Sequence, residues 1–310
     1  MNTAIKIAGF LIALAAVFGI ALGIGKVVGP AAEPAATHDG GHDDSSSTAA
    51  AADEEAKPPG GLMVSQNGYT FTLADEQARP GRNIGVSFTI DDPTGKPVTE
   101  YDVEHEKRLH LIAVRRDFTG FQHVHPELGS DGVWSTQLDV TAGQWRLFAD
   151  FKATDADALT LGADLAVDGD YRPEAPAGES RTAQVDGYTV TLDGDLAAGK
   201  DAKLTLDVSR AGGPVTDLQP YLGAYGHLVA LRSGDLAYLH VHPDGTPEDG
   251  KTQPGPEVVF HAAVPSSGTY HLYLDFRHDG VVRTAAFIVS TGKAVHAEAE
   301  KEESSDGHGH

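Results

Sequence analysis

The chain has 310 residues, of which 40% are hydrophobic and 22% are charged, so it is long enough for two ordinary domains with packed cores. Its 23 basic and 45 acidic side chains give a formal net charge of −22, which repels nucleic acid and attracts cations. Cysteine is absent, so disulfides, thiolate metal sites and cysteine nucleophiles are excluded, and a bound metal has to be held by imidazole and carboxylate groups.

The chain begins with an uncharged, mostly apolar run at residues 7–25, between Lys6 and Lys26. This run is close to the length of a membrane-spanning helix and longer than the apolar part of an ordinary signal peptide. We therefore expect residues 1–28 to be an uncleaved transmembrane signal anchor, with cleavage near "AAEPAA" and secretion as the alternative. Because Lys6 lies in the short N-terminal end and the acidic bulk of the chain follows the run, the positive-inside rule predicts a single-pass protein of the cell membrane, with its N-terminus inside and its domains outside the cytoplasm.

Two segments that flank the body of the chain contain almost no large apolar side chains. Residues 29–62 are rich in Pro, Ala, Gly, Ser and Asp, and residues 292–310 form an acidic tail that ends in "DGHGH". Neither segment can bury enough apolar surface to offset the entropy lost on ordering. We expect a disordered linker at the first and a disordered acidic, histidine-containing tail at the second.

Between these segments the sequence repeats. The string "NGYTFTL" at residues 67–73 returns as "DGYTVTL" at residues 186–192, and "WRLFADFK" at residues 145–152 returns as "YHLYLDFR" at residues 270–277. Two copies are too few for a solenoid, so the duplication indicates two tandem domains. The expected boundaries are residues 63–170 for repeat 1, 171–183 for a linker and 184–291 for repeat 2.

Each repeat is built from short segments in which apolar and polar residues alternate. Examples from repeat 1 are "YTFTL", "NIGVSFTI", "RLHLIAV" and "GQWRLFADF", which are rich in Val, Thr, Tyr and Phe. Helical periodicity is not found after the N-terminal run. About seven strands in about 110 residues favour an all-β fold, in which two tandem immunoglobulin-like or cupredoxin-like β-sandwich domains follow an N-terminal transmembrane helix.

The string "HVHP" occurs once in each repeat, at residues 123–126 and at residues 240–243. In repeat 2 it belongs to a predicted β-hairpin, because the pair Gly234-Asp235 is a favourable two-residue turn between two strand-like segments. Pairing about this turn places Leu231 opposite Tyr238. The proline that ends the string also ends the strand, which places the histidines near the rim of the sandwich.

Three histidines of repeat 2 are expected to meet on one side of this hairpin. The pairing places His227 opposite His242, and His240 lies two residues before His242 on the same face of the strand. Opposed residues have Cβ atoms roughly 5 Å apart, so a metal with bonds of about 2 Å would be reached by all three rings. Repeat 1 keeps the spacing, although its turn "RDFTG" leaves room for a shift of register. The proposed metal ligands are His110, His123, His125, His227, His240 and His242.

Three further side chains are candidates for holding the ligands in place. Asp150 and Asp275 recur late in each repeat, and a carboxylate there would accept a proton from a ligating imidazole and set its tautomer. His271 falls on the same strand face as Asp275 and would enrich the site of repeat 2. The alternative for the two aspartates is an ion pair at the strand end, with Lys152 or with Arg277.

The segment "GFQHVHP" resembles a short stretch of the copper–zinc superoxide dismutases, and "HVHPDG" at residues 240–245 resembles part of the histidine run of metallo-β-lactamase-type hydrolases. Carbonic anhydrases also place His-x-His on one strand and a third histidine on its neighbour. Each of these matches covers only a few residues. A wider resemblance is to bacterial membrane-anchored or secreted proteins associated with heavy metals, especially copper, whose tandem immunoglobulin-like domains carry H-x12-H-V-H-P. This resemblance spans most of both repeats and implies a periplasmic or cell-surface role in metal handling. Its residues here are His110, Leu111, Val114, Phe121, His123–Pro126, His227, Leu228, Leu231 and His240–Pro243.

These features predict a membrane-tethered, extracytoplasmic protein that binds copper or zinc through one three-histidine site per repeat. The protein would buffer the metal or hand it to a membrane metal transporter. The first alternative is a non-metal adhesive or scaffolding β-sandwich protein in which the histidines are structural, because a buried imidazole with hydrogen-bond partners is stable without metal. A zinc or copper enzyme is a further alternative, but there is no nucleophile motif and no convincing general base, so we expect no enzyme.

Overall fold

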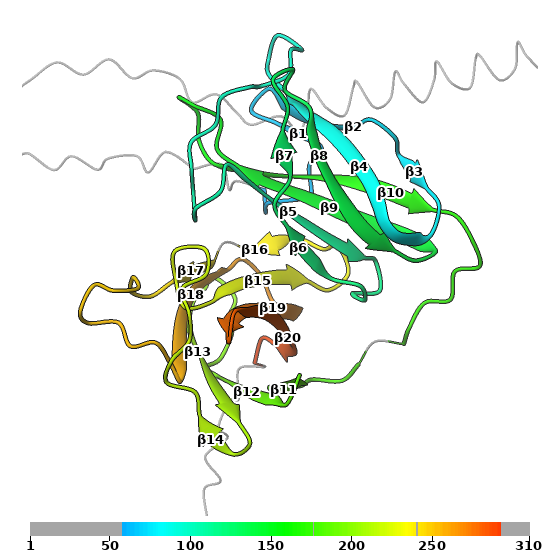
Figure 1. Cartoon of the computed structure of the whole chain (residues 1–310). Helices are drawn as coiled ribbons and strands as arrows, with labels where there is room; N and C mark the ends of the chain where they lie inside the picture. The colour runs from blue at the N-terminus through cyan, green and yellow to red at the C-terminus, as the bar shows by residue number, and fades with distance from the viewer. Residues whose placement is uncertain (1–57, 176, 240, 293–310) are drawn as a thin grey trace, which may run out of the picture. The chain divides into compact units, whose positions relative to one another are not determined.

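The structure is a computed structural model that describes residues 58–175, 177–239 and 241–292 (Figure 1). The expected transmembrane anchor, most of the expected N-terminal linker, the tail beyond Gly292 and His240 lie outside the described residues. Within the part of the chain that is described, no helix is long and apolar enough to cross a membrane. Both repeats fall in the same compact unit of the chain.

Repeat 1 contains ten strands in two five-stranded sheets (Figure 1). One sheet has the order β1-β2-β4-β8-β7, and the other has the order β3-β10-β9-β5-β6. The strands are β1 (Ser65–Gln66), β2 (Tyr69–Leu73), β3 (Gln77–Ala78), β4 (Gly81–Asp91), β5 (Leu109–Arg115), β6 (Gln122–Val124), β7 (Glu127–Leu128), β8 (Trp134–Val140), β9 (Gly143–Phe151) and β10 (Leu159–Val167).

These two sheets have the topology of an immunoglobulin domain. Strands β2, β4, β8 and β7 take the places of A, B, E and D, whereas β5, β9 and β10 take the places of C, F and G, with β6 beside β5. Strand β3 pairs in parallel with β10, and the other named strand pairs of the repeat are antiparallel. The expected immunoglobulin-like β-sandwich is therefore confirmed in repeat 1.

Repeat 2 follows the same plan. Its first sheet has the order β11-β12-β13-β18-β17, with β14 beside β13, and its second sheet has the order β16-β15-β19-β20. The strands are β11 (Thr182–Val185), β12 (Tyr188–Asp193), β13 (Lys200–Arg210), β14 (Gly213–Pro214), β15 (His227–Arg232), β16 (Tyr238–Leu239), β17 (Val241–Pro243), β18 (Glu257–Val264), β19 (Thr269–His278) and β20 (Val281–Ser290).

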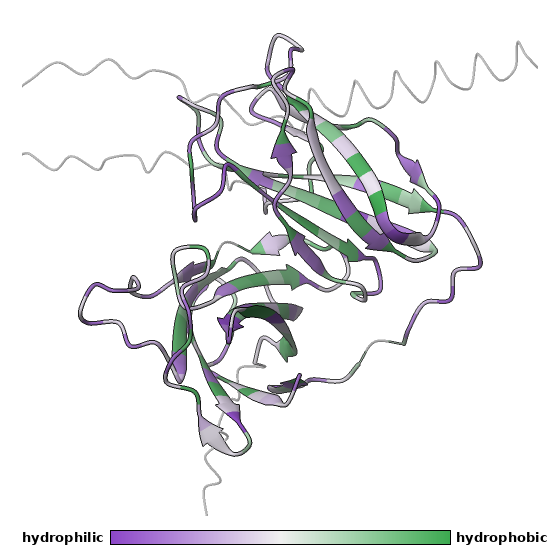
Figure 2. Cartoon of the chain, viewed as in Figure 1, coloured by the Kyte–Doolittle hydropathy of each residue, from purple (hydrophilic) through white to green (hydrophobic). Residues whose placement is uncertain are grey.

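Each repeat encloses its own apolar core between its two sheets. Along β4 the side chains of Val86, Phe88 and Ile90 are buried, while the residues between them are more exposed, as period-two alternation predicts. Figure 2 shows this alternation as hydrophobic and hydrophilic bands along the strands. In repeat 2 the corresponding core is centred on residues such as Tyr270 and Phe276. Each fully buried large apolar side chain stabilises its repeat by roughly 1.5–3 kcal/mol.

Three strands depart from this alternation, because β5, β15 and β19 are buried on both faces over most of their length. One face of each strand packs into the core of its own repeat. The other face belongs to a third apolar cluster, which we call the inter-repeat face because both repeats contribute to it. Its buried members are Ile112, Val114, Phe148, Val229, Leu231, Leu236, Tyr238 and Tyr273.

The contacts of the inter-repeat face have approximate twofold symmetry. Phe121 of repeat 1 stacks on Tyr273 of repeat 2, with ring centroids 3.9 Å apart. Phe121 corresponds to Tyr238 of repeat 2, and Tyr273 corresponds to Phe148 of repeat 1. This second pair also makes a ring contact, with centroids 5.8 Å apart. The same contact is therefore made twice with the roles of the repeats exchanged, as in a twofold-symmetric dimer of separate chains.

Candidate metal centre

The histidines of repeat 1 lie where β5 and β6 pair. Leu111 lies opposite Val124 and Ile112 lies opposite His123 in this antiparallel ladder. The same register places His110 opposite His125, so the turn "RDFTG" introduces no shift. His110 occupies the position two residues before Ile112, and it therefore continues the row of side chains on the inter-repeat face. The histidines lie on that outer face of the sandwich and not in its core.

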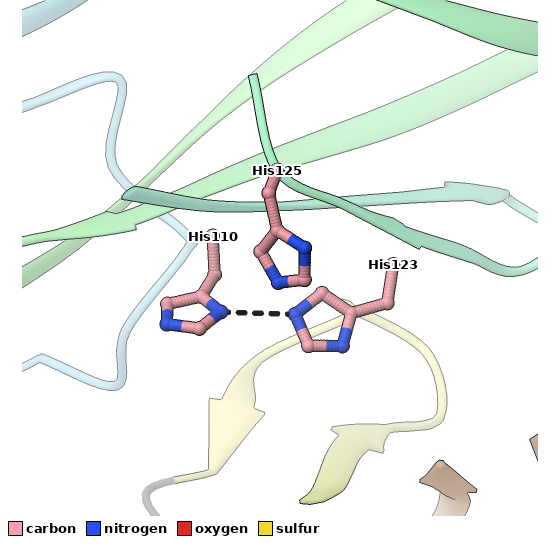
Figure 3. Close-up of side chains that lie close together, drawn as sticks. All are labelled: His110, His123 and His125. Atoms are coloured by element: carbon pink, nitrogen blue, oxygen red, sulfur yellow. Dashed lines mark hydrogen bonds between the residues drawn. The ribbon is translucent and has the colours of Figure 1, made fainter. Parts of the chain in front are cut away.

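Three imidazoles converge at this point (Figure 3). His110, His123 and His125 each offer one nitrogen, and these nitrogens all lie within 4.8 Å of one another. Nδ1 of His110 and Nε2 of His123 are 3.1 Å apart. Two nitrogens bound to one tetrahedral metal at about 2.0–2.1 Å lie roughly 3.3 Å apart, so this pair already has the spacing of two ligands of a common ion.

Hydrogen-bond partners determine which nitrogen of two rings carries a proton. Nε2 of His110 lies 3.1 Å from the carbonyl oxygen of Glu104, which can only accept, so Nε2 donates and Nδ1 is bare in the neutral ring. Nδ1 of His123 lies 2.8 Å from a carboxylate oxygen of Asp275, so Nδ1 donates and Nε2 is bare in the neutral ring. The two nitrogens that face each other are the bare ones, and either an extra proton or a cation has to lie between them.

His125 supplies the third nitrogen. Its Nε2 is buried and has no hydrogen-bond partner. A buried polar atom without a partner destabilises the folded state by about 1–3 kcal/mol, so such an atom in a native protein points to a bound water, a bound ion or a strained site. Because His125 belongs to the same group of possible metal ligands, a metal ion held there would give its ring a polar partner.

The environment keeps two of these rings neutral. Burial lowers the pKa of His110 to about 3, and the neighbouring His123 adds to the shift. Burial also lowers the pKa of His125 to about 3, again with His123 as the second cause. Neutral imidazole is the form that binds metal, so at neutral pH both rings present free lone pairs.

Repeat 2 places its histidines differently. The register about its turn is the expected one, since Leu231 lies opposite Tyr238. However, the chain then leaves this sheet: β17 pairs with β18, and His242 lies opposite His261 in the other sheet. The expected pairing of His227 with His242 is therefore wrong, because residues 241–243 cross to the first sheet of repeat 2. His240 lies outside the described residues, so its role as a ligand stays a prediction.

His227 joins the histidines of repeat 1 instead. Its ring stacks on that of His110, with centroids 5.5 Å apart and planes 8° from parallel, and its centroid lies 4.8 Å from that of His123. Burial lowers the pKa of His227 well below its usual range. Its nitrogens are not part of the three-residue group that could share one ion, so His227 covers the cluster and is not a fourth member of it.

Of the three residues expected to hold the ligands in place, only Asp275 forms a hydrogen bond with an expected ligand that the structure describes. It does so across the repeats, because its partner is His123 of repeat 1. The Asp275 side chain is 3% exposed and the His123 side chain is 1% exposed. Asp150 accepts a hydrogen bond from Thr160, and burial raises its pKa to about 6. His271 stacks on Phe118 with ring centroids 3.7 Å apart, away from the histidine cluster, and burial lowers its pKa to about 4.

A tight turn at residues 104–107 was missed by the sequence argument. Glu104 and Lys107 are bonded to each other in both directions, and the two residues between them, His105 and Glu106, have positive φ values of 48° and 65°. This turn presents the Glu104 carbonyl to His110 and brings the His105 ring within 5.8 Å of the His227 ring. Histidine is found at positive φ more often than most residues but glutamate is not, so the sequence offers only a weak signal for this turn.

A family model described as "Domain of unknown function (DUF8832)" matches residues 64–169 and, a second time, residues 183–293. The chain belongs to this family. The DUF8832 domain is present twice, which agrees with the internal duplication seen in the sequence and in the two sandwiches. The description of DUF8832 names no function. No curated protein matches the chain in sequence.

Solved structures that match the chain include bacterial adhesins. FdeC, an adhesin of Escherichia coli, is 14% identical over 74% of this chain and 65% of its own, with a TM-score of 0.24. InvE, an adhesin of Yersinia pseudotuberculosis, is 11% identical over 74% of this chain and 60% of its own, with a TM-score of 0.22. The D0-D1 domain of intimin is 13% identical over 72% of this chain and 97% of its own, with a TM-score of 0.21. The chain spans less than two thirds of FdeC and InvE, and TM-scores this low carry no functional argument.

Proposed function

We propose that this protein binds a divalent transition-metal ion, Zn(II) or Cu(II), through His110, His123 and His125. The observation that carries the proposal is the meeting of three imidazole nitrogens, of which two are bare and 3.1 Å apart and the third is buried without a partner. Three neutral imidazoles suit Zn(II), Cu(II) and Ni(II) better than Ca(II) or Mg(II), which prefer oxygen ligands.

The wider role in the proposal is buffering or delivery of the metal outside the cytoplasm. It rests on the apolar run at residues 7–25, which would tether the domains to the membrane, and on the net charge of −22, which attracts cations. We propose no catalytic activity. A membrane metal transporter as recipient, and a relationship to copper-associated proteins, belong to the same proposal.

The second candidate is an adhesive or scaffolding protein in which the histidines are structural. One observation favours it: His123 bridges the repeats by its bond to Asp275, at 2.8 Å. A doubly protonated His123 would donate to both His110 and Asp275, and the cluster would then hold the repeats together without metal. The two candidates differ in what lies between His110 and His123.

The test is a metal titration of the full-length protein, solubilised in detergent and carrying no histidine tag. Binding of Zn(II) and Cu(II) is followed by calorimetry in competition with a chelator of known affinity. The informative variant is His125→Phe, because the buried Nε2 that it removes has no hydrogen bond to lose. The matched control is His261→Phe, since His261 lies on β18, half exposed, outside the cluster.

We expect the wild-type protein and His261→Phe to bind one high-affinity equivalent that His125→Phe has lost. Weak binding that all three proteins share would come from histidines elsewhere in the chain, and it is not counted as part of the high-affinity equivalent. If wild type and His125→Phe bind metal alike, the metal proposal is wrong and the structural role of the histidines stands.

A further inference from the structure

Repeat 2 supplies side chains that contact the metal-binding histidines of repeat 1. We propose that the bound ion acts as a clasp between the two repeats: one ion per chain is held by the histidines of repeat 1, and repeat 2 closes the site with Asp275 and His227. This inference rests on the proposed metal binding and adds its consequence, which is that metal binding and inter-repeat association strengthen each other.

Asp275 is built as the carboxylate that orients a ligand. One of its oxygens accepts from Nδ1 of His123 at 2.8 Å, and the other accepts from Oγ1 of Thr284 at 2.5 Å. With both oxygens engaged and 2% of the residue exposed, the carboxylate has a single orientation. A carboxylate that accepts the distal proton of a ligating imidazole fixes the ring and makes it a stronger ligand. Here that carboxylate comes from the other repeat.

His227 closes the same side of the site. It lies directly opposite Asp275 in the pairing of β15 with β19, so one strand pair presents both residues to repeat 1. Its ring covers His110 in a near-parallel stack, 8° between planes. His110 and His227 are equivalent residues of the two repeats. Their rings therefore stack close to the approximate twofold axis that relates the repeats.

The turns before these histidines also meet across the interface. Residues 104–107 of repeat 1 and residues 221–224 of repeat 2 form equivalent turns, each closed by paired hydrogen bonds. The backbone N–H of Gly223 donates to Oε1 of Glu106 at 3.2 Å. The first turn also holds His110 through the Glu104 carbonyl. A separation of the repeats would therefore remove Asp275 and His227 and would loosen the turn that orients His110.

Although the contacts are nearly symmetric, the described residues gather only one such triad of histidines. Asp150 is the repeat 1 equivalent of Asp275, and its carboxylate accepts from Thr160 of its own repeat. His242 is the repeat 2 equivalent of His125, and it lies on β17 in the opposite sheet. The only group of three or more metal-binding side chains found in the described residues is His110, His123 and His125. The expected stoichiometry is one tightly bound ion per chain.

The effect of the ion on the association of the repeats follows from the thermodynamic coupling between metal binding and that association. Loss of an outer partner of a ligating histidine weakens metal binding by about 10–100-fold. Because coupling between two binding equilibria is reciprocal, an ion whose affinity falls by that factor when repeat 2 leaves must tighten the association of the repeats by the same factor. Without metal, the apolar inter-repeat face still holds the repeats together, but more weakly.

The test uses the whole chain with the linker made cleavable. A protease site is inserted at Ala177-Gly178, which is exposed between the repeats. Each repeat has a core of its own, so the nicked protein keeps both domains. The dissociation constant of the two halves is then measured by dilution, with Zn(II) or with a chelator present. His125→Phe, cleaved in the same way, is the control that keeps the interface and lacks the ion.

We expect Zn(II) to tighten the association of the halves by about 10–100-fold in the wild-type protein and to have no effect in His125→Phe. Asp275→Asn should weaken metal binding by about the same factor in the uncut protein, whereas Asp150→Asn should change it much less. If the nicked protein binds one ion but its halves associate equally with and without it, the clasp is wrong and the metal site stands. If no ion binds at all, the proposed function and the clasp both fail.

Discussion

Repeat 1 and repeat 2 carry the same four residues, "HVHP", in different structural settings. In repeat 1 the first two of these residues end β6, beside β5, and the next strand of the opposite sheet begins at Glu127. In repeat 2 the strand beside β15 ends at Leu239, and the chain has already joined the opposite sheet at Val241. The string is therefore shared, but the point at which the chain crosses between sheets is not.

The earlier crossing accompanies a longer connection to the next strand. Residues 244–256 separate β17 from β18, whereas residues 129–133 separate β7 from β8. Because side chains alternate along a strand and each sheet has its own outward face, a change of sheet redirects every histidine that follows it. A duplicated motif thus produces one gathered triad among the described residues and not two. The predictions that follow test this difference.

The largest expected effect is loss of packing at the inter-repeat face. Phe148→Ala removes a fully buried ring that contacts Tyr238 of repeat 2, and a change of this kind destabilises a protein by about 3–5 kcal/mol. Urea unfolding in the presence of a chelator measures it. Phe148→Leu, which keeps most of the apolar volume, is expected to lose much less. An effect of Phe148→Ala below about 1 kcal/mol would mean that the repeats do not pack through this face.

The next effect separates the two copies of the string. Zn(II) at one hundred times its dissociation constant should stabilise the wild-type protein by about 2.7 kcal/mol, because the ion binds the folded state. His125→Phe should abolish this increase and His242→Phe should retain it, since His125 belongs to the cluster and His242 lies on β17 in the other sheet. Thermal unfolding with and without Zn(II) gives the comparison. Equal losses in both variants would show that both copies bind metal.

Acid should destabilise repeat 2 through His271. Burial lowers its pKa to about 4, so below the unfolded value of about 6.5 the unfolded chain binds a proton that the folded protein does not. The stability from the neutral ring is complete above pH 6.5 and is lost as the pH falls from 6.5 towards 4, by up to about 1.4 kcal/mol per pH unit for one group.

His271→Leu keeps an apolar partner for Phe118 and removes the titrating group. Its stability, measured with a chelator present, should fall less steeply with acid than that of the wild-type protein. Parallel pH profiles for wild type and His271→Leu would show that the ring is protonated in the folded protein.

The smallest effect concerns a single bond across the inter-repeat face. The Tyr273 hydroxyl donates to the carbonyl oxygen of Phe118 at 2.9 Å, and burial raises the pKa of Tyr273, so the hydroxyl stays protonated. Tyr273→Phe keeps the ring stacked on Phe121 and removes that bond, which should destabilise the protein by about 0.5–1.5 kcal/mol. Chemical denaturation resolves this, and no loss of stability would indicate that water replaces the bond.

Much of the fold could be predicted from local patterns. Period-two alternation along segments such as residues 81–91 predicted strands, and the recurrence of whole segments predicted two domains of one kind. The hairpin register was also within reach, because spacing alone placed Leu231 opposite Tyr238. These predictions succeed because strand alternation and turn length are properties of a few neighbouring residues.

The sequence contains one sign that the repeats contact each other, which is a strand segment without apolar–polar alternation. The segment "LHLIAV" of β5 is apolar at nearly every position, and strands with such runs are buried on both faces. One face had to pack against something other than the core of repeat 1. The sequence cannot say against what, because the partner strands β15 and β19 lie more than one hundred residues further along the chain.

The sequence by itself determined the chemistry available to this protein and its plan of two tandem all-β domains. Without cysteine, its metal-binding chemistry has to be that of imidazole and carboxylate, and its alternating segments have to form β-sheets. Only the tertiary structure decided which histidines meet. His123 receives its carboxylate from Asp275, 152 positions away, and His242 leaves for another sheet although its neighbours in sequence match those of His125. The physical reason is that side-chain alternation is a local property, whereas the packing of one sheet against another depends on both repeats at once.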